Sequence, residues 1–287
     1  MSEPRIITNA NGPVSALAGA YAYYRVALTL TAPMLGTVSA DPEVYRQYVL
    51  GPALAKLQSA QDWRVQADAD ELEDELKTLP PLLDEEGEQV RVRSTFHRNA
   101  DNEPCIYGYL VMANLQEACQ VLRMGDTKGP DGKPLGLESK KLTTYQKSIR
   151  TNLFVLAPQR LITLNAAGAE WPIPADPAAP PYDAKNLPIM VRPLRANTPQ
   201  GPRVAIAASD FVPAGTTLNF HISLLNTGKV TEAMLIEWLD YGAQHGLGQW
   251  RAAQWGTYYF ELEPVDRAAV ADLIRARVSR IPFTMRL

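Results

Sequence analysis

The sequence is poor in the residues that mark several functional classes. Only two of its 287 residues are cysteines, Cys105 and Cys119, and they form neither a disulfide framework nor a zinc-binding pattern. Only three are histidines, and the Gly-x-Ser-x-Gly, His-Glu-x-x-His and Walker patterns are absent. These absences argue against a disulfide-stapled protein, a zinc protein, a serine hydrolase and a P-loop nucleotidase. We expect no cofactor.

Long apolar runs and an excess of basic charge are also missing. No run of about 18 apolar residues is present, so we expect no membrane-spanning helix. The first residues lack the charged-then-apolar order of a signal peptide, and unpaired cysteines are typical of a reducing compartment, so we expect a cytoplasmic protein. The net charge is −3, so any nucleic acid must be held by a local basic surface.

Hydrophobic periodicity predicts a mixed, α+β fold. Thr216 to Leu225 alternates between polar and apolar residues, which is typical of a half-buried strand. Thr231 caps a helix whose first turn contains Glu232. We therefore predict an antiparallel sheet in β-α-β-β-α-β order. The predicted strands lie near 24–31, 153–164, 216–225 and 257–262, and the helices near 110–123 and 231–243, with a last helix at about 264–280.

We expect one elaborated domain, residues 1–287, with insertions at about 37–104, 125–147 and 168–200. The first is acidic between residues 68 and 88, which we interpret as a solvated surface. The second is basic around a Gly-Pro-Asp-Gly turn, which indicates either an exposed hairpin, poorly ordered without a partner, or an ordinary solvated loop. Its candidate nucleic-acid contacts are Lys133, Lys140 and Lys141. The third is a proline-rich arm.

A glycine-rich segment follows the helix predicted at 231–243. Gly246 and Gly248 let the backbone approach a partner closely, and Arg251 beside Trp250 and Trp255 offers a phosphate contact next to stacking surfaces. The alternative is a helix C-cap at Gly246 with two core tryptophans. The segment is not a dinucleotide-binding fingerprint, because that motif follows a strand and opens a helix.

These pieces resemble the RAMP superfamily, the ferredoxin-like proteins that build CRISPR effector backbones. The matching residues are Ala32 to Thr37 after the first strand, Ile106 to Leu110 at a helix start, and Gly246 to Arg251. The resemblance implies a ferredoxin-like (RRM-like) antiparallel sheet core with large insertions. It also implies RNA binding, often by repeated subunits, and a projecting hairpin, for which 125–147 is our candidate. The acidic charge balance departs from that pattern.

We therefore expect a non-catalytic RNA-binding backbone subunit of a CRISPR-type ribonucleoprotein effector. Its partners would be guide or other single-stranded RNA and further copies of itself or related subunits. Arg192, Arg195 and Arg203, in a cationic turn-rich loop, would line the groove with Arg251, although surface arginines paired with carboxylates fit the same pattern.

Two alternatives stay open. One is an assembly subunit, viral or otherwise, that uses the fold without nucleic acid. The other is a metal-dependent ribonuclease that uses Asp41, which we otherwise interpret as a helix cap before Pro42. Family members that cut RNA with a histidine carry it near the N-terminus, where His97, His221 and His245 do not lie.

Overall fold

The computed structural model describes residues 19–39, 93–198 and 201–278, which form an α+β fold, as predicted. The strands are β1 (Tyr21–Leu30), β2 (Met34–Leu35), β3 (Val38–Ser39), β4 (Arg93–Thr95), β5 (His97–Arg98), β6 (Pro104–Tyr107), β7 (Leu153–Leu156), β8 (Leu161–Asn165), β9 (Ile189–Thr198), β10 (Gly201–Val212), β11 (Thr217–Leu225) and β12 (Tyr258–Val265). The α-helices are α4 (Gly108–Met124), α5 (Tyr145–Asn152), α6 (Glu232–His245) and α7 (Arg267–Val278). Short 3-10 turns are η2 (Glu138–Lys141), η3 (Pro158–Arg160) and η4 (Arg251–Ala253).

The larger sheet is built around β1. Its strand order is β12-β1-β11-β8-β6-β5, and β7 also pairs with β11. β1 is antiparallel to both neighbours, so that Val26 lies opposite Phe220 on β11 and Leu262 on β12. Because side chains alternate along a strand, Val26, Leu28 and Leu30 all point to one face, where they are buried.

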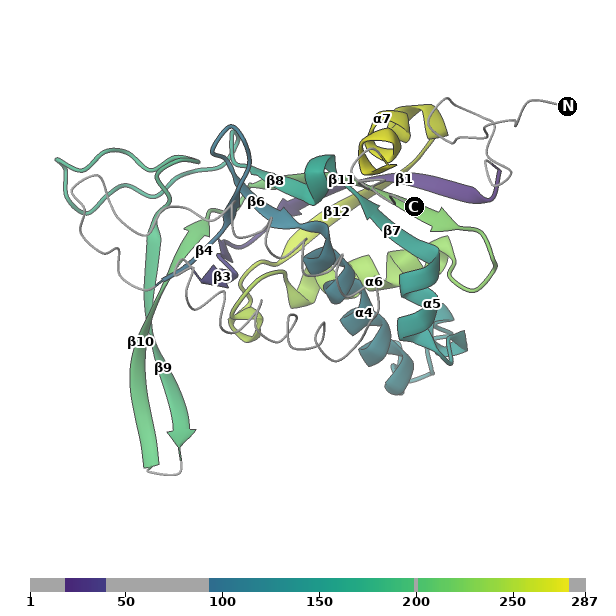
Figure 1. Ribbon diagram of the computed structural model, residues 1–287. Coiled ribbons are helices and arrows are strands. Elements are labelled where there is room, and N and C mark those ends of the chain that lie inside the picture. The colour runs from purple at the N-terminus through teal and green to yellow at the C-terminus, as the bar shows by residue number, and fades with distance from the viewer. Residues whose placement is uncertain (1–18, 40–92, 199–200, 279–287) are drawn as a thin grey trace, which may run out of the picture.

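Helices cover both faces of this sheet. α4 and α6 contact each other and pack on the face that carries Val26 (Figure 1). α7 packs on the opposite face, where Val270 joins Tyr23 and Leu156 in a small apolar cluster. The face is only partly covered, since Arg25 and Glu263 pair there at 2.8 Å with exposed side chains.

Local sequence signals explain α6. The Thr231 hydroxyl accepts a hydrogen bond from the Met234 amide, and Glu232 lies in the first turn, where the helix dipole favours a carboxylate. The helix ends at Gly246 with φ 86°, a conformation that glycine adopts without strain. Trp238 is fully buried, and its indole N–H donates to the Ser139 hydroxyl at 2.9 Å. This contact holds η2 against α6.

The predicted strands and helices occur in the predicted order, but β2 to β6, β9 and β10 are strands outside that prediction, and the following details also differ. The strand predicted at 153–164 is two strands, β7 and β8, separated by η3. The last helix begins at Arg267, because β12 continues to Val265. The helix α5 was not predicted. Asp41, its predicted helix and the acidic segment 68–88 lie outside the described residues.

The prediction of a turn-rich loop at residues 192–203 is wrong. β9 and β10 form a long antiparallel hairpin whose register runs from Ile189 opposite Asp210 to Thr198 opposite Gly201. Pro193 and Pro202 suggested a loop, but a two-stranded ribbon has a free edge on each strand, where a residue without an amide hydrogen is tolerated. Figure 1 shows this hairpin leaving the rest of the fold, and we call residues 189–212 the β9–β10 arm.

The root of the arm belongs to the second sheet, of order β2-β10-β4-β3. Phe211 lies opposite Leu35 on β2, and Ala208 opposite Arg93 on the parallel strand β4. The buried carboxylate of Asp210 accepts from the Thr95 hydroxyl at 2.6 Å and pairs with Arg93 at 3.0 Å. Burial raises the pKa of Asp210, although Thr95 and Arg93 lower it. Polar contacts thus fasten the arm to the sheet.

Candidate nucleic-acid interface

The glycine loop, residues 246–256, is folded tightly on itself. Gly246 and Gly256 have φ of 86° and 73°, and a β-carbon on either would collide with the carbonyl of Trp255 or Leu247, respectively. The Leu247 amide donates to the Gly256 carbonyl and the Gly256 amide to the Pro33 carbonyl, both at 2.8 Å. Gly246 and Gly256 thus approach the chain's own backbone closely, while the approach of Gly246 and Gly248 to a partner stays a prediction.

Gly248 brings the loop against the turn that follows β1. Its φ is 83°, and a β-carbon there would lie 3.0 Å from the Leu35 carbonyl oxygen. Both Gly248 and Gln249 are partly exposed, next to the root of the arm. A larger residue at 248 would force the loop away from β2.

Arg251 is engaged by a carboxylate from α4. One of its terminal nitrogens lies 2.5 Å from Glu117, which also contacts His245 at 3.1 Å. Partial burial alone raises the pKa of Glu117, but the contacts with Arg251 and His245 hold it below its ordinary value. Arg251 thus ties the glycine loop to α4.

Trp250 and Trp255 are not core residues. Trp250 is 42% exposed as a residue, and Trp255 is partly buried. Their rings stack with centroids 5.8 Å apart, and Phe211 of the arm meets Trp255 edge-on at 6.0 Å. The rings lie where the glycine loop meets the arm.

Arg192 of β9 completes this junction. It is 6% exposed and donates to the Ser209 hydroxyl at 3.1 Å and the Gln249 amide oxygen at 3.0 Å. Its guanidinium lies over the Trp250 ring, 5.2 Å from the centroid. Gln249 also donates to the Ser94 hydroxyl of β4 at 3.3 Å. Arg192 therefore joins the arm, the glycine loop and the second sheet.

The other predicted contacts lie apart from this junction. Arg195 and Arg203 lie further along the arm, opposite Val204 and Ala196. The three predicted lysines belong to the segment between α4 and α5, where η2 contacts α4 and α6. The nearest carboxylates to them are Asp131, Asp126 and Glu138, respectively. The structure thus brings together Gly246, Gly248, Trp250, Arg251 and Arg192, and leaves Lys133, Lys140 and Lys141 elsewhere.

Sequence reasoning missed Ser209, Gln249 and Glu117. Each acts through a partner distant in the chain: Gln249 is 57 residues from Arg192, and Glu117 is 134 residues from Arg251. A polar residue carries no local pattern that announces such a partner.

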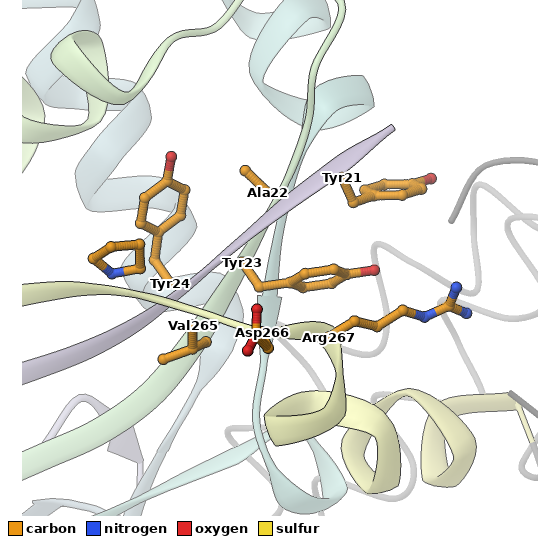
Figure 2. Close-up of a pocket in the computed structure, with 8 residues that line it drawn as sticks. Tyr21, Ala22, Tyr23, Tyr24, Val265, Asp266 and Arg267 are labelled. Carbon is orange, nitrogen blue, oxygen red and sulfur yellow. The ribbon is translucent and has the colours of Figure 1, made fainter. Parts of the chain in front are cut away.

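A separate hollow of about 280 Å³ lies where β12 ends beside β1. Figure 2 shows the rings of Tyr21 and Tyr23 extending in the same direction as Arg267, while Tyr24 points to the other side of the strand. The two rings stack at 6.2 Å. Tyr24 donates to Glu232 at 3.0 Å, and burial with this hydrogen bond raises the pKa of Tyr24 to about 12. None of the residues predicted to bind nucleic acid lines this hollow.

Residues 19–39, 93–198 and 201–278 contain no group of three or more histidine, cysteine or acidic side chains arranged to hold a metal ion. Within the same residues, no helix combines the length and apolar character needed to cross a bilayer.

Comparisons with known proteins give structural matches only. No family model matches the sequence, and no curated protein matches it. One similar chain comes from a Type IV-B CRISPR complex, at 15% identity and a TM-score of 0.36, covering 84% of this chain and 90% of that one. Another comes from a cryo-EM structure of the Type III-B Cmr-beta complex bound to cognate target RNA, at 11% identity and 0.37. That match covers 86% of this chain but 63% of the other. TM-scores this low establish neither family nor function.

Proposed function

We propose that this protein is a non-catalytic RNA-binding backbone subunit of a CRISPR-type ribonucleoprotein effector, acting in the cytoplasm with further copies of itself or with related subunits. The proposal gives it a ferredoxin-like core with large insertions, as the sequence resemblance implies. The antiparallel order β12-β1-β11-β7, with α4 after β1 and α6 after β11, supports that core.

The β9–β10 arm is the observation that carries the proposal. Arg192, Arg195 and Arg203, all proposed contacts from the sequence, lie on this one projecting hairpin. A hairpin rich in arginine brings several cations to one phosphate backbone, although the whole chain has a net charge of −3. The glycine loop supports the arm at its root, through Gln249 and Trp250.

The other predicted residues take supporting roles in this proposal. Gly246 and Gly248 shape the loop, and Arg251 fixes it to α4 through Glu117. Lys133, Lys140 and Lys141 would offer further contacts from the segment between α4 and α5, where the Lys133 side chain is 83% exposed. Such exposed lysines contact phosphates without reading the bases.

The proposal is tested by measuring RNA affinity for a variant in which arginines of the β9–β10 arm are replaced by glutamate. The full chain is titrated into labelled single-stranded RNA, and fluorescence anisotropy is recorded at several salt concentrations. Arg195→Glu with Arg203→Glu should lower affinity at least tenfold and reduce the salt slope by about 2, one for each lost phosphate contact. Lys229→Glu, an exposed residue before α6, is the matched control. Equal affinity of the double variant and the control, or no RNA binding by the wild type, would reject the proposal.

A specific observation also favours the assembly function as a second candidate. On the arm, Val191 is 59% exposed and Ile206 is 77% exposed. Exposed apolar side chains on a projecting element are typical of protein contacts. Light scattering of nuclease-treated protein separates the two functions, because an assembly that forms without RNA requires a protein interface.

A further inference from the structure

Arg192 is a buried cation that has no ion pair with any of the described residues. Its partners Ser209 and Gln249 are neutral, and burial lowers its pKa with no carboxylate of the described residues offsetting the effect. Its Nε is buried and has no hydrogen-bond acceptor. Buried charges are normally paired and buried N–H groups normally bonded, because dehydration of either is costly. The arm's root therefore holds one positive charge and one N–H donor that lack an anionic partner among the described residues.

Two other arginines near the arm's root and the glycine loop differ from Arg192 in having an ion pair. Arg93 pairs with Asp210, and Arg251 pairs with Glu117. Asp210 is adjacent to Ser209 in the chain, yet its carboxylate is taken up by Arg93 and Thr95. Of these three arginines, Arg192 alone has a guanidinium whose charge is not neutralised by a described carboxylate.

Trp250 covers this guanidinium in a strained conformation. Its backbone is left-handed, with φ 59° and ψ 36°, which is unfavourable for a bulky aromatic residue. Its ring lies over Arg192 while 42% of the residue faces solvent. Strain of this kind persists where the surroundings impose it, and it is concentrated in ligand clamps and switches. A strained, solvent-facing indole over a buried cation that no described carboxylate pairs with is an arrangement suited to a ligand with an anionic and a planar part.

We propose that Arg192 and Trp250 form a closed clamp for one nucleotide of a bound single strand. The indole moves off the guanidinium. A phosphate of the strand then accepts hydrogen bonds from the Nε and a terminal nitrogen of Arg192, and the base stacks on Trp250. The planar guanidinium matches phosphate in a two-point contact, and base–indole stacking replaces the cation–π contact. This inference rests on the proposed RNA binding. It adds that Arg192 and Trp250 hold one nucleotide and that Trp250 moves on binding.

Fluorine NMR tests the clamp in an intact protein. The full chain, labelled with 5-fluorotryptophan, gives five resonances, one for each tryptophan, and the Trp250 resonance is assigned by its loss in Trp250→Phe. An oligouridylate of about twelve nucleotides is the probe. The Trp250 resonance should shift on addition of the oligonucleotide and less on addition of inorganic phosphate. Binding without any shift of that resonance would overturn the clamp and leave RNA binding standing.

Affinity measurements on variants give an independent test. Trp250→Ala and Arg192→Gln should each weaken oligouridylate binding about tenfold, and Trp250→Phe should retain most of the affinity. The double variant should lose less than the product of the two effects, because both residues hold one nucleotide. Arg25→Gln, whose exposed arginine pairs with Glu263, is the control and should bind like the wild type.

Two outcomes of the affinity test separate the hypotheses. Wild-type affinity of both single variants, with unchanged melting temperatures, would reject the clamp alone. A wild type that binds no oligouridylate at about 50 mM salt, where phosphate contacts are strongest, would reject the proposed function and the clamp together.

Discussion

The β1 sheet and the β9–β10 arm are stabilised in different ways. β1 has a neighbouring strand on each side, and its inner face, with Val26 and Leu28, is buried under α4 and α6. The arm has two strands, and Val191 and Ile206 are largely exposed on it. Its root is held by the polar side chains of Asp210 and Arg192.

This difference indicates how stability and function are divided. An isolated two-stranded ribbon is marginally stable in water, so the arm depends on its root and on whatever it contacts. Burial of apolar surface stabilises the sheet whether or not a partner is present. Substitutions in the sheet should therefore change unfolding, and substitutions along the arm should change binding.

The largest loss of stability is expected where α6 packs on the β1 sheet. Trp238→Ala removes a fully buried indole and its hydrogen bond to Ser139, and should cost about 4 kcal/mol. Urea unfolding followed by circular dichroism measures the loss. Trp238→Phe keeps most of the volume and should cost less than half as much. A loss below 1 kcal/mol for Trp238→Ala would show that α6 is not anchored there.

The second-largest loss of stability is expected in the glycine loop. Gly256→Ala adds a β-carbon against the Leu247 carbonyl and a side chain at φ 73°, and should cost about 3 kcal/mol. Gly132→Ala is the matched control, because Gly132 has φ 75° but open space around it, and should cost about 1 kcal/mol. Equal losses at the two positions would show that contact with Leu247 contributes nothing.

The arm's root should show a smaller, pH-dependent loss. Asp210→Asn removes the carboxylate that pairs with Arg93 and should cost less than about 1 kcal/mol at pH 7, because burial disfavours that charge. Burial raises the folded-state pKa of Asp210, so the native state holds the proton more tightly than the unfolded state does. The contribution of Asp210 to stability should therefore decline as the pH rises from the unfolded-state pKa through the folded-state one.

The direction of this pH dependence is checked by measuring the unfolding free energies of the wild type and of Asp210→Asn between pH 4 and pH 7. Asn does not titrate, so the wild type should lose stability relative to Asp210→Asn as the pH rises. A relative gain instead would mean that the pairing with Arg93 and Thr95 outweighs burial.

The smallest effect on stability is expected on the arm itself. Ile206→Thr replaces a side chain on a residue that is 77% exposed, and should change the unfolding free energy by less than about 0.5 kcal/mol. Self-association, followed by analytical ultracentrifugation, should decrease if the arm contacts another protein chain. A large loss of stability with unchanged association would show that Ile206 belongs to the fold.

Local sequence patterns made the β1 sheet and the helices that cover it predictable. Thr231 with Glu232 marks the start of α6, and the alternation of Leu218, Phe220 and Ile222 marks β11. These signals depend on neighbours in the sequence. Pro193 and Pro202 carried a misleading local signal, because proline is excluded from central strands and not from the free edges of a ribbon.

The candidate site was predictable only in part. The glycine after the predicted helix marked the end of α6 at Gly246, and the role of the loop in binding stays a prediction. The sequence did not distinguish Arg251, paired with Glu117, from Arg192, which has no described carboxylate partner. That distinction depends on contacts between segments that are distant in the chain.

The central place of β1 has a consequence for synthesis on the ribosome. Val26 leaves the exit tunnel long before Phe220 and Leu262, the residues opposite it. Since non-local strand pairing forms late, β1 stays without neighbouring strands for most of translation, with an aggregation-prone apolar segment exposed. Production of this protein should therefore depend strongly on chaperones that hold nascent chains. Lower growth temperatures, which slow translation, should increase its yield.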